Sequence, residues 1–246
     1  MRRLDYQAMK AFVNEEIVHF HDARIAALEK INLRDVLKKK NPYLFRAKNI
    51  LTAGDLLSSM LDALLSSSEE KIFGDFLESL AIFVSQQTSD GRKSSASGID
   101  LEFQSDDTLY LVSIKSGPNW GNSSQYQSLR ENFRKALVVQ KQVRAPVRIQ
   151  PVLGICYGKT RTTDNGHYLK ITGQNFWYFL SNDHNLYIDI IEPIGHRARH
   201  HNDEFVKKKA ALQNRLAITF IQDFCLPDGQ INWVELVSFN SGNLKI

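Results

Sequence analysis

Two charged residues, Asp100 and Lys115, are spaced so that they could do chemistry together. Asp100 stands at the start of one predicted strand and Lys115 near the end of a second, with Asp106 and Asp107 as the polar turn between them. Antiparallel pairing across this turn brings the outer ends of the strands together, so we expect the carboxylate to meet the ammonium group. A carboxylate can hold Mg²⁺, and a lysine can orient water and stabilise developing charge. The pair suits metal-assisted cleavage of a phosphodiester.

The same segment resembles the PD-(D/E)xK nuclease superfamily, which includes most type II restriction endonucleases. The matching residues are Asp100 and the run Ser113-Ile114-Lys115. Ile99 stands where the motif has proline, and Ser113 stands where it has a second acid, so one metal-binding carboxylate is missing. Some restriction enzymes of this superfamily have a small residue there and recruit the acid from another element. An ordinary solvated hairpin would contain similar residues, so the neighbouring segments decide between the two interpretations.

Three glutamates are candidates for the missing acid. Glu78 lies on an apolar helix predicted over residues 73–84, and a helix before the core hairpin often presents a glutamate to the metal in this superfamily. Glu78 is therefore preferred, with an ordinary helix-surface glutamate as the alternative. Glu102 lies one pleat beyond Asp100 on the same side of its strand, and Glu131 lies in the helix after the lysine. Glu78 or Glu131 would complete the metal's shell.

The resemblance also implies a role for each residue of the motif. Asp100 would ligate Mg²⁺, with Mn²⁺ as a substitute, together with the replacement acid and the carbonyl of Ile114. Lys115 would contact the attacking water and the scissile phosphate. Ser113 would assist only through a water-mediated contact.

The segment after Lys115 has the composition of a loop that binds nucleic acid. It is rich in Gly, Asn, Ser and Gln and leads into a helix predicted over residues 126–139, with Ser123 or Ser124 as its N-cap. Helix N-termini hold phosphates, and Asn or Gln can read adenine edges, although a plain connecting loop would also contain glycine and proline. The candidate DNA contacts are Asn119, Trp120, Asn122, Ser123, Ser124 and Gln125, with Arg92, Lys93, Lys159 and Arg161 from other segments.

The order of predicted elements is that of the superfamily's nuclease core: strand, strand, helix, strand. The last strand is predicted over residues 147–157. An aromatic helix at 176–180 and a charged helix around 203–216 resemble a subset of restriction enzymes that cut interrupted palindromes, and the resemblance spans roughly residues 8 to 240. We expect an α/β fold with a restriction-endonuclease-like mixed β-sheet core flanked by helices, and a helical N-terminal region.

That N-terminal region is predicted from helical spacing of apolar residues over 6–40 and again over 53–65. The lysines of 38–40 and Pro42 are expected to end the first helix. We expect residues 1–70 to form a helical region for dimerisation or DNA grip, and residues 71–246 to form the nuclease core with C-terminal helices. The polar segment 86–98 predicts a mobile loop that leads into Asp100.

Composition narrows the class of protein. A chain of 246 residues can bury a sizeable core, and a net charge of +4 permits nucleic-acid binding without requiring it. Cys156 and Cys225 stand in apolar surroundings at wide spacing, as reduced core residues would. No apolar run reaches the length of a membrane span, and no signal peptide is evident. We expect a cytoplasmic protein without a membrane partner.

Three other motifs are rejected as sites. Gly158-Lys159-Thr160 follows a strand, but the Walker pattern needs four residues between its glycines and Gly154 leaves three. His196 and His200 have zinc-binding i,i+4 spacing but no further ligand set, so a basic surface loop is expected. The aromatic run 176–180 is expected to lie in the core.

Taken with the resemblance, these features predict a type II restriction endonuclease that cuts both strands of DNA at a short palindromic site. Palindromic cutting needs two sites related by two-fold symmetry, so a homodimer is expected. The resemblance also implies a cognate DNA methyltransferase that protects the host. Two alternatives stay open: an inactive DNA-binding module of the same fold, and a repair or recombination nuclease that recognises DNA structure.

Overall fold

The computed structural model describes residues 1–143 and 148–243 and confirms a mixed α/β fold with a helical N-terminal region. The chain forms two compact units. The sheet unit comprises Met1–Val18 and Phe73–His196, and the helical unit comprises His19–Ile72 and Arg197–Ile246. Two long helices, α1 (Tyr6–Glu29) and α4 (Ala53–Ser89), contribute to both units.

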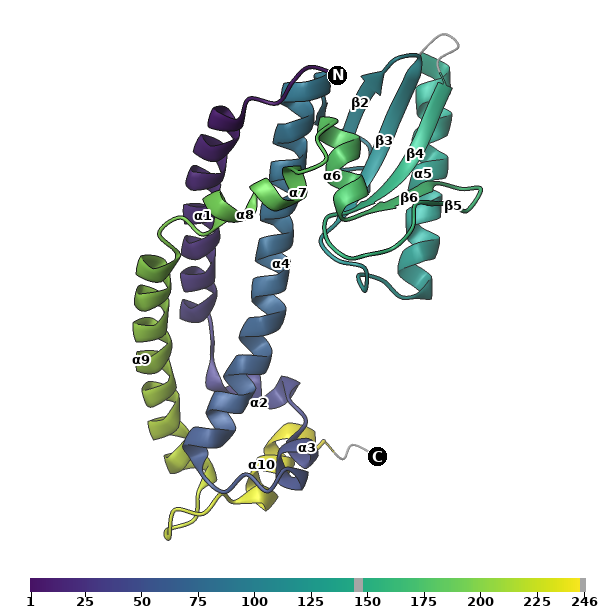
Figure 1. Cartoon of the computed structure of the whole chain (residues 1–246). Helices are drawn as coiled ribbons and strands as arrows, with labels where there is room; N and C mark the ends of the chain where they lie inside the picture. Colours follow the sequence, from purple (N-terminus) through teal and green to yellow (C-terminus); the bar gives the residue numbers. More distant parts are fainter. Residues whose placement is uncertain (144–147, 244–246) are drawn as a thin grey trace. The chain divides into compact units, whose positions relative to one another are not determined.

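The sheet unit contains a mixed six-stranded sheet in the order β1-β2-β3-β4-β6-β5 (Figure 1). Its strands are β1 (Arg92–Lys93), β2 (Leu101–Ser105), β3 (Thr108–Lys115), β4 (Arg148–Ile155), β5 (Thr163–Asp164) and β6 (Leu169–Thr172). β2 and β3 are antiparallel, whereas β3, β4 and β6 are parallel. The predicted order of strand, strand, helix, strand is confirmed by β2, β3, α5 (Ser123–Val143) and β4. Val147, the first residue of the last predicted strand, lies outside the described residues.

The β2–β3 hairpin has the predicted two-residue turn. Ser105 is opposite Thr108, and Asp106 adopts a left-handed conformation with φ of 50°, which aspartate tolerates better than most residues. At the far end, Leu101 is opposite Val112, and the Asp100 N–H donates to the Val112 carbonyl at 2.9 Å. The register therefore places Asp100 beside the last three residues of β3.

Helices cover both faces of this sheet (Figure 1). Leu129, Phe133 and Ala136 of α5 pack with Leu111 and Leu153 of the strands into one core cluster. Because neighbouring strand residues point to opposite faces, Tyr110 and Gly154 belong to the other face. There, helix α6 (Gln174–Ser181) places Phe179 against Tyr110, with 5.1 Å between ring centroids, and Phe176 closes over Gly154. Phe176, Trp177 and Leu180 are buried, as predicted for the aromatic run 176–180, whereas Tyr178 is exposed, so this prediction is confirmed only in part.

One prediction about the helical segments is wrong and another is incomplete. The pattern over 6–40 is broken after Glu29, because Asn32 caps a new helix, α2 (Leu33–Lys39). A helix does end at the lysines of 38–40, as expected, but Pro42 also begins the helix α3 (Pro42–Ala47), since its missing N–H costs nothing in the first turn and Asn41 provides the cap. The helices predicted over 53–65 and 73–84 are parts of one helix of 37 residues, α4.

The predicted mobile loop over 86–98 is also wrong in part. α4 continues to Ser89, and β1 pairs with β2 through Arg92 opposite Glu102 and Lys93 opposite Leu101. Beyond β1, the Ser94 N–H donates to the Asp100 carbonyl at 3.2 Å. The segment before Asp100 is thus attached to the edge of the sheet by backbone hydrogen bonds.

The remaining elements are short helices of the sheet unit and helices of the helical unit. α7 (Leu186–Asp189) and α8 (Ile191–Ile194) follow α6, whereas α9 (Ala198–Phe224) and α10 (Trp233–Ser241) belong to the helical unit. The basic loop expected around His196 and His200 is wrong from Ala198 onward, where α9 begins. The helical unit has its own core, which includes Leu56, Met60, Leu61 and Phe220.

Gly98 positions the start of β2, and its replacement tests this packing. Gly98 has φ of +75°, and a Cβ there would overlap the Asn132 amide of α5 and lie 2.7 Å from its Cγ. We expect Gly98→Ala to lower the free energy of unfolding by about 1–3 kcal/mol because alanine is strained in the left-handed backbone conformation. Overpacking against Asn132 should lower it by a similar amount. Urea unfolding measures the loss.

Gly166 provides the matched control, because its φ is +78° but no atom lies within 4 Å of a Cβ built there. Gly166→Ala should show only the backbone cost. Adding Asn132→Ala should restore part of the stability of Gly98→Ala; equal losses in the two glycine variants would contradict the packing argument.

Candidate active site

The hairpin brings Asp100 and Lys115 to one point. Lys115 Nζ lies 3.8 Å from Asp100 Oδ2. Their side chains are 20% exposed for Asp100 and 31% exposed for Lys115, so both are largely shielded yet reachable from solvent. The pair lies where β2 begins and β3 ends, at the end of the hairpin away from its turn.

Asp100 is held by the strand opposite. Oδ2 accepts the backbone N–H of Ile114 at 2.6 Å and the hydroxyl of Ser113 at 3.3 Å. Within the described residues, these bonds and the ion pair with Lys115 all use Oδ2. The carboxylate is therefore fixed in orientation by one oxygen, and Oδ1 is not engaged in these contacts. Ser113 therefore helps to fix the orientation of Asp100. It occupies the position at which the PD-(D/E)xK motif has a carboxylate.

Lys115 has three neighbours at the site. Nζ donates to the Ile114 carbonyl at 2.8 Å, pairs with Asp100, and lies 5.6 Å from the centre of the Trp120 ring. The backbone of Lys115 is fixed on its other side, where its carbonyl accepts the Cys156 N–H at 2.9 Å. The Ile114 carbonyl, a predicted metal ligand, is thus bound to the lysine.

Glu78 shares the electrostatic environment of this pair. Burial raises the pKa of Glu78, and the negative charge of Asp100 raises it further, whereas Lys93 and Lys115 lower it. Glu78 Oε1 lies 3.6 Å from Lys93 Nζ. Helix α4 therefore places a second carboxylate, that of Glu78, near the hairpin. Lys93 and Lys115 offset its negative charge only in part.

The two rival acids have other partners. Arg134 donates to both carboxylate oxygens of Glu131 at 2.7 and 2.9 Å, and this hydrogen bond lowers the pKa of Glu131. Glu131 also lines a cavity with Gly166 and His167, away from the hairpin end. Glu102 is buried, accepts from Arg92 at 2.6 Å and from Gln140 at 3.3 Å, and so fixes the edge of the sheet to α5.

The site provides oxygen atoms that could ligate a metal ion, but it has no dense cluster of acidic side chains. In residues 1–143 and 148–243, no group of three or more His, Cys, Asp or Glu side chains is close enough to hold a metal ion. Asp100, Glu78 and the Ile114 carbonyl are nevertheless hard oxygen ligands, and Mg²⁺ is commonly held by one or two carboxylates with several waters. Burial is the main cause that raises the pKa of Glu78, and the negative charge of Asp100 raises it further; a divalent cation would relieve this repulsion. The residues present fit Mg²⁺.

The loop after Lys115 is organised by helix capping. The Asn122 side chain accepts the Gln125 N–H at 3.1 Å, and the Gln125 side chain accepts the Asn122 N–H at 2.9 Å. This reciprocal capping box makes Asn122 the N-cap, so the predicted caps Ser123 and Ser124 are wrong. The amides of Asn122 and Gln125, candidates for base contacts, are engaged in holding the helix terminus.

Most candidate DNA contacts are nonetheless on the surface. Those with exposed side chains are Arg92, Lys93, Asn119, Asn122, Ser123, Ser124, Gln125, Lys159 and Arg161. Trp120 is different, because it is partly buried against the α5 core cluster. The pattern of Gly, Asn and Ser around it suggested an exposed ring. Its contact with Lys115 follows from the path of residues 116–122, which no local pattern predicts.

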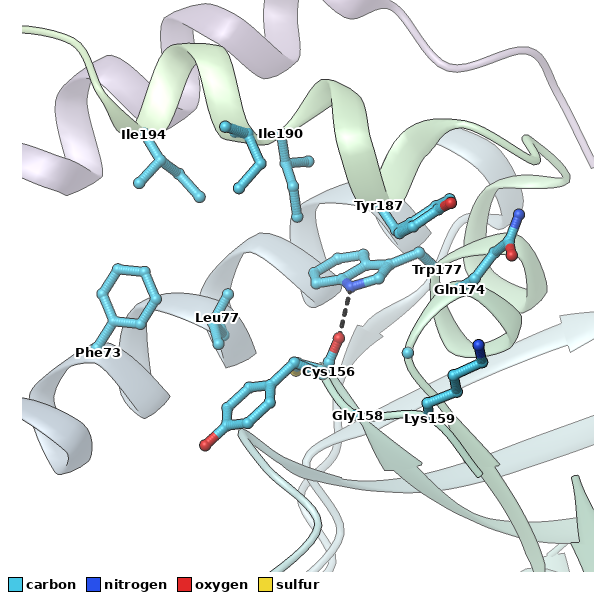
Figure 2. A pocket seen from close by; sticks show the side chains of 13 residues that line it. Phe73, Leu77, Cys156, Gly158, Lys159, Gln174, Trp177, Tyr187, Ile190 and Ile194 are labelled. Carbon is cyan, nitrogen blue, oxygen red and sulfur yellow. Dashed lines mark hydrogen bonds between the residues drawn. The ribbon is translucent and has the colours of Figure 1, made fainter. Parts of the chain in front are cut away.

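A cavity of about 580 Å³ borders the site (Figure 2). Its walls come from Phe73 and Leu77 of α4, Trp177 of α6, and Ile190 and Ile194 beyond it. Cys156 also lines this cavity, and burial and then the charge of Glu78 raise the pKa of its thiol. Figure 2 shows the Trp177 indole donating to the Cys156 carbonyl, at 2.9 Å, which fixes the end of β4 beside Lys115. This cavity was not predicted from the sequence, because its apolar residues have the pattern of ordinary core.

Comparisons with known proteins identify one family. A model of the type II restriction endonuclease EcoO109I family matches residues 7–202, which is more than half of the chain and includes every candidate site residue. A search of curated proteins finds no match. Separately, no helix among the described residues is long and apolar enough to cross a membrane.

The raised pKa of Glu78 predicts a pH-dependent stability. The folded state binds the Glu78 proton more tightly than the unfolded state, so this group stabilises the fold at low pH. That contribution is lost as pH rises above the ordinary pKa of a glutamate and through the raised pKa of Glu78. Glu78→Gln should therefore raise the thermal unfolding midpoint at pH 7.5 relative to wild type, and the difference should shrink toward pH 4.

Glu131→Gln is the matched control, since the pKa of Glu131 is shifted in the opposite direction. This variant should leave the midpoint unchanged or lower it at pH 7.5. The two midpoints can be followed by circular dichroism between pH 4 and pH 8. A lower midpoint for Glu78→Gln at pH 7.5 would refute the interpretation of Glu78 as a carboxylate repelled by Asp100.

Proposed function

The chain belongs to the EcoO109I family of type II restriction endonucleases, and from this premise we propose that it makes Mg²⁺-dependent cuts in both strands of duplex DNA at a specific short palindromic site. The observation that carries the proposal is the clamped carboxylate of Asp100 beside Lys115. These are the residues that match the PD-(D/E)xK motif, and the hairpin register sets them side by side. The resemblance to enzymes that cut interrupted palindromes extends the proposal to a target of that kind.

Asp100, Glu78 and the Ile114 carbonyl would hold the Mg²⁺ ion, with Mn²⁺ as a substitute. When bound, the ion supplies Lewis-acid polarisation of the scissile phosphate and a lower pKa for a nearby water. Glu78 is favoured over Glu131 because its charge already acts on Asp100 and is not neutralised by an arginine. Ser113 acts indirectly, by fixing the acid that binds the ion.

Lys115 would act on the phosphate and the attacking water. Its ammonium group is held within hydrogen-bonding distance of the Ile114 carbonyl, and its side chain is 31% exposed. From there it can donate to a water and to a phosphate oxygen, orienting the first and stabilising the charge that develops on the second. Its donation to Ile114 and its pair with Asp100 keep it at the site before substrate arrives.

The remaining assignments follow from the substrate. Restriction endonucleases act on double-stranded DNA, and a palindrome presents two equivalent scissile bonds, so we propose a homodimer with one site in each protomer. The exposed cations Arg92, Lys93, Lys159 and Arg161 would contact the phosphate backbone. A cognate DNA methyltransferase would protect the host, and both proteins would work in the cytoplasm, where the unpaired thiols of Cys156 and Cys225 stay reduced.

One observation favours a second candidate, an inactive DNA-binding module. Serine occupies the position of the second motif acid, and the described residues contain no cluster of three potential metal ligands. Such a module would bind DNA without cutting it.

Incubation of the purified protein with unmethylated phage DNA, with and without Mg²⁺, tests these alternatives. Discrete bands that require Mg²⁺ are expected, and sequencing of their ends would give the target. A smear would favour a nuclease without sequence specificity or one that recognises DNA structure. Retained binding without cutting would favour the inactive module.

In the same assay, Asp100→Ala and Lys115→Ala should each lower the cleavage rate by at least about 10²–10³-fold, the loss typical of removing a group that stabilises the transition state. DNA affinity measured without Mg²⁺ should stay close to that of wild type. Asp107→Ala removes an exposed carboxylate from the other end of the same hairpin and should cleave normally. Full activity in either site variant, or unfolding of both, would overturn the assignment.

The identity of the second acid gives a separate prediction. Glu78→Gln should raise the Mg²⁺ concentration for half-maximal cleavage by about tenfold or more, equivalent to about 1.4 kcal/mol of lost ion binding. Glu131→Gln should leave that concentration unchanged, because its carboxylate is paired with Arg134. Titration of Mg²⁺ in single-turnover cleavage measures both. The reverse order would place the acid on α5.

A further inference from the structure

Trp120 lies against the ammonium group of Lys115 and is held there by packing. Lys115 Nζ is 5.6 Å from the ring centroid, within the range of a cation–π contact. The indole also packs on Tyr126 of α5, with 4.6 Å between ring centroids, and borders the core cluster on that face of the sheet. The capping box of Asn122 and Gln125 fixes the chain two residues further on. The ring is therefore part of the fold and is not placed to reach into a DNA groove.

The indole N–H makes this position unusual. In the described part of the chain, Nε1 of Trp120 is buried and has no hydrogen-bond partner. A phenyl ring would fill much of the same space without burying an unpaired N–H group, which is unfavourable. What an indole offers over a phenyl ring is the stronger attraction for a cation. The cation within reach is Lys115.

The other partners of Lys115 explain why such a contact is needed. Its ammonium group binds the Ile114 carbonyl and Asp100, and both are assigned above to the metal. If these oxygens held the ion, the lysine would lose two polar partners, and the positive charge of the ion would repel its ammonium group. The face of the Trp120 ring also attracts the ammonium group, and a metal ion bound to the two oxygens would not compete for this contact.

We propose that Trp120 is a positioning residue that holds the Lys115 ammonium group at the site, and not a contact to DNA bases. This inference rests on the proposed function, in which Lys115 acts on the phosphate. It assigns Trp120 a different role from that of the exposed polar residues in the same loop, such as Asn119.

Trp120→Phe separates the two roles. The variant keeps an aromatic ring and removes the unpaired N–H, so its unfolding midpoint should equal or exceed that of wild type. Its single-turnover cleavage rate at saturating Mg²⁺ should fall about 5- to 30-fold, the change expected for weakening a contact of this class. Affinity for the cleavage site, measured without Mg²⁺, should stay within about twofold, because the contact is internal to the protein. Trp120→Ala should lower the rate further.

Trp177→Phe is the contrasting variant for stability. The Trp177 indole donates to the Cys156 carbonyl, so its loss leaves a buried acceptor unpaired and should lower the unfolding midpoint. A fall in midpoint for Trp120→Phe as large as that for Trp177→Phe would overturn the argument from the unpaired N–H group.

A double-mutant cycle tests the contact without any cleavage. Lys115→Met keeps the aliphatic stem and removes the charge; if Trp120 holds that charge, the midpoint shifts of Lys115→Met and Trp120→Phe should not add in the double variant. Additive shifts would overturn the proposal. So would weaker DNA binding by Trp120→Phe with an unchanged cleavage rate, which is the signature of a base contact.

The outcomes also distinguish this inference from the proposed function. If wild-type protein does not cut DNA, the proposed function fails, and the cycle alone judges the contact. If wild type cuts, Asp100→Ala does not, and Trp120→Phe cuts at the wild-type rate, then only the role of Trp120 is wrong.

Discussion

The hydrogen bond from the Ile114 N–H to the Asp100 carboxylate, 2.6 Å long, joins the chemistry of this chain to its fold. β2 begins at Leu101, so the Ile114 N–H lies beyond the paired part of the β2–β3 ladder. A buried backbone donor needs an acceptor, and the Asp100 side chain supplies one. The hydrogen bond that satisfies this donor at the end of the β2–β3 ladder therefore also orients the acid. Any shift of register by one residue would turn Ser113 and Lys115 to the opposite face and separate them from Asp100.

Parallel pairing of β3 with β4 fixes the end of β3 on the side away from β2. The Lys115 carbonyl accepts the Cys156 N–H, and the Trp177 indole holds the Cys156 carbonyl. The backbone of the lysine is thus fixed through Cys156 to the buried Trp177 of α6, while its ammonium group stays partly exposed. A rigid backbone with a reachable terminal group is what a residue needs if it is to act on a bound phosphate.

Local sequence patterns predicted the part of this site that lies within one hairpin. The turn at Asp106 and Asp107 and the alternation on either side are sufficient to define the hairpin, and hence the meeting of Asp100 with Lys115. The continuity of α4 was not predictable in the same way, because residues 66–71 are Ser, Glu and Lys and interrupt the apolar pattern that marks a helix. The start of α3 at Pro42 was not predicted, because proline is compatible with both the end and the first turn of a helix.

The choice of the second acid depends on long-range packing, which local sequence patterns do not predict. The sequence favoured Glu78 for the missing acid but left Glu131 open, since the final choice depends on charges from other elements. Arg134 lies one helical turn from Glu131 and neutralises it, a pairing that the spacing alone could have indicated. The burial of Glu78 and its repulsion by Asp100 could not be inferred from spacing, because they depend on how α4 packs against the hairpin.

With serine at position 113, the second acid of the proposed metal site would come from a helix instead of the strand. A carboxylate on β3 would be positioned by the hairpin alone, whereas Glu78 is positioned only when α4 packs on the sheet. Gly74, one turn before Glu78, is part of that packing, because a Cβ there would already be in contact with Ser116 at 3.6 Å. The proposed metal site is therefore complete only in the folded sheet unit. Its two acids come from separate elements, and the repulsion between them is balanced in part by Lys93 and Lys115 until a divalent cation binds.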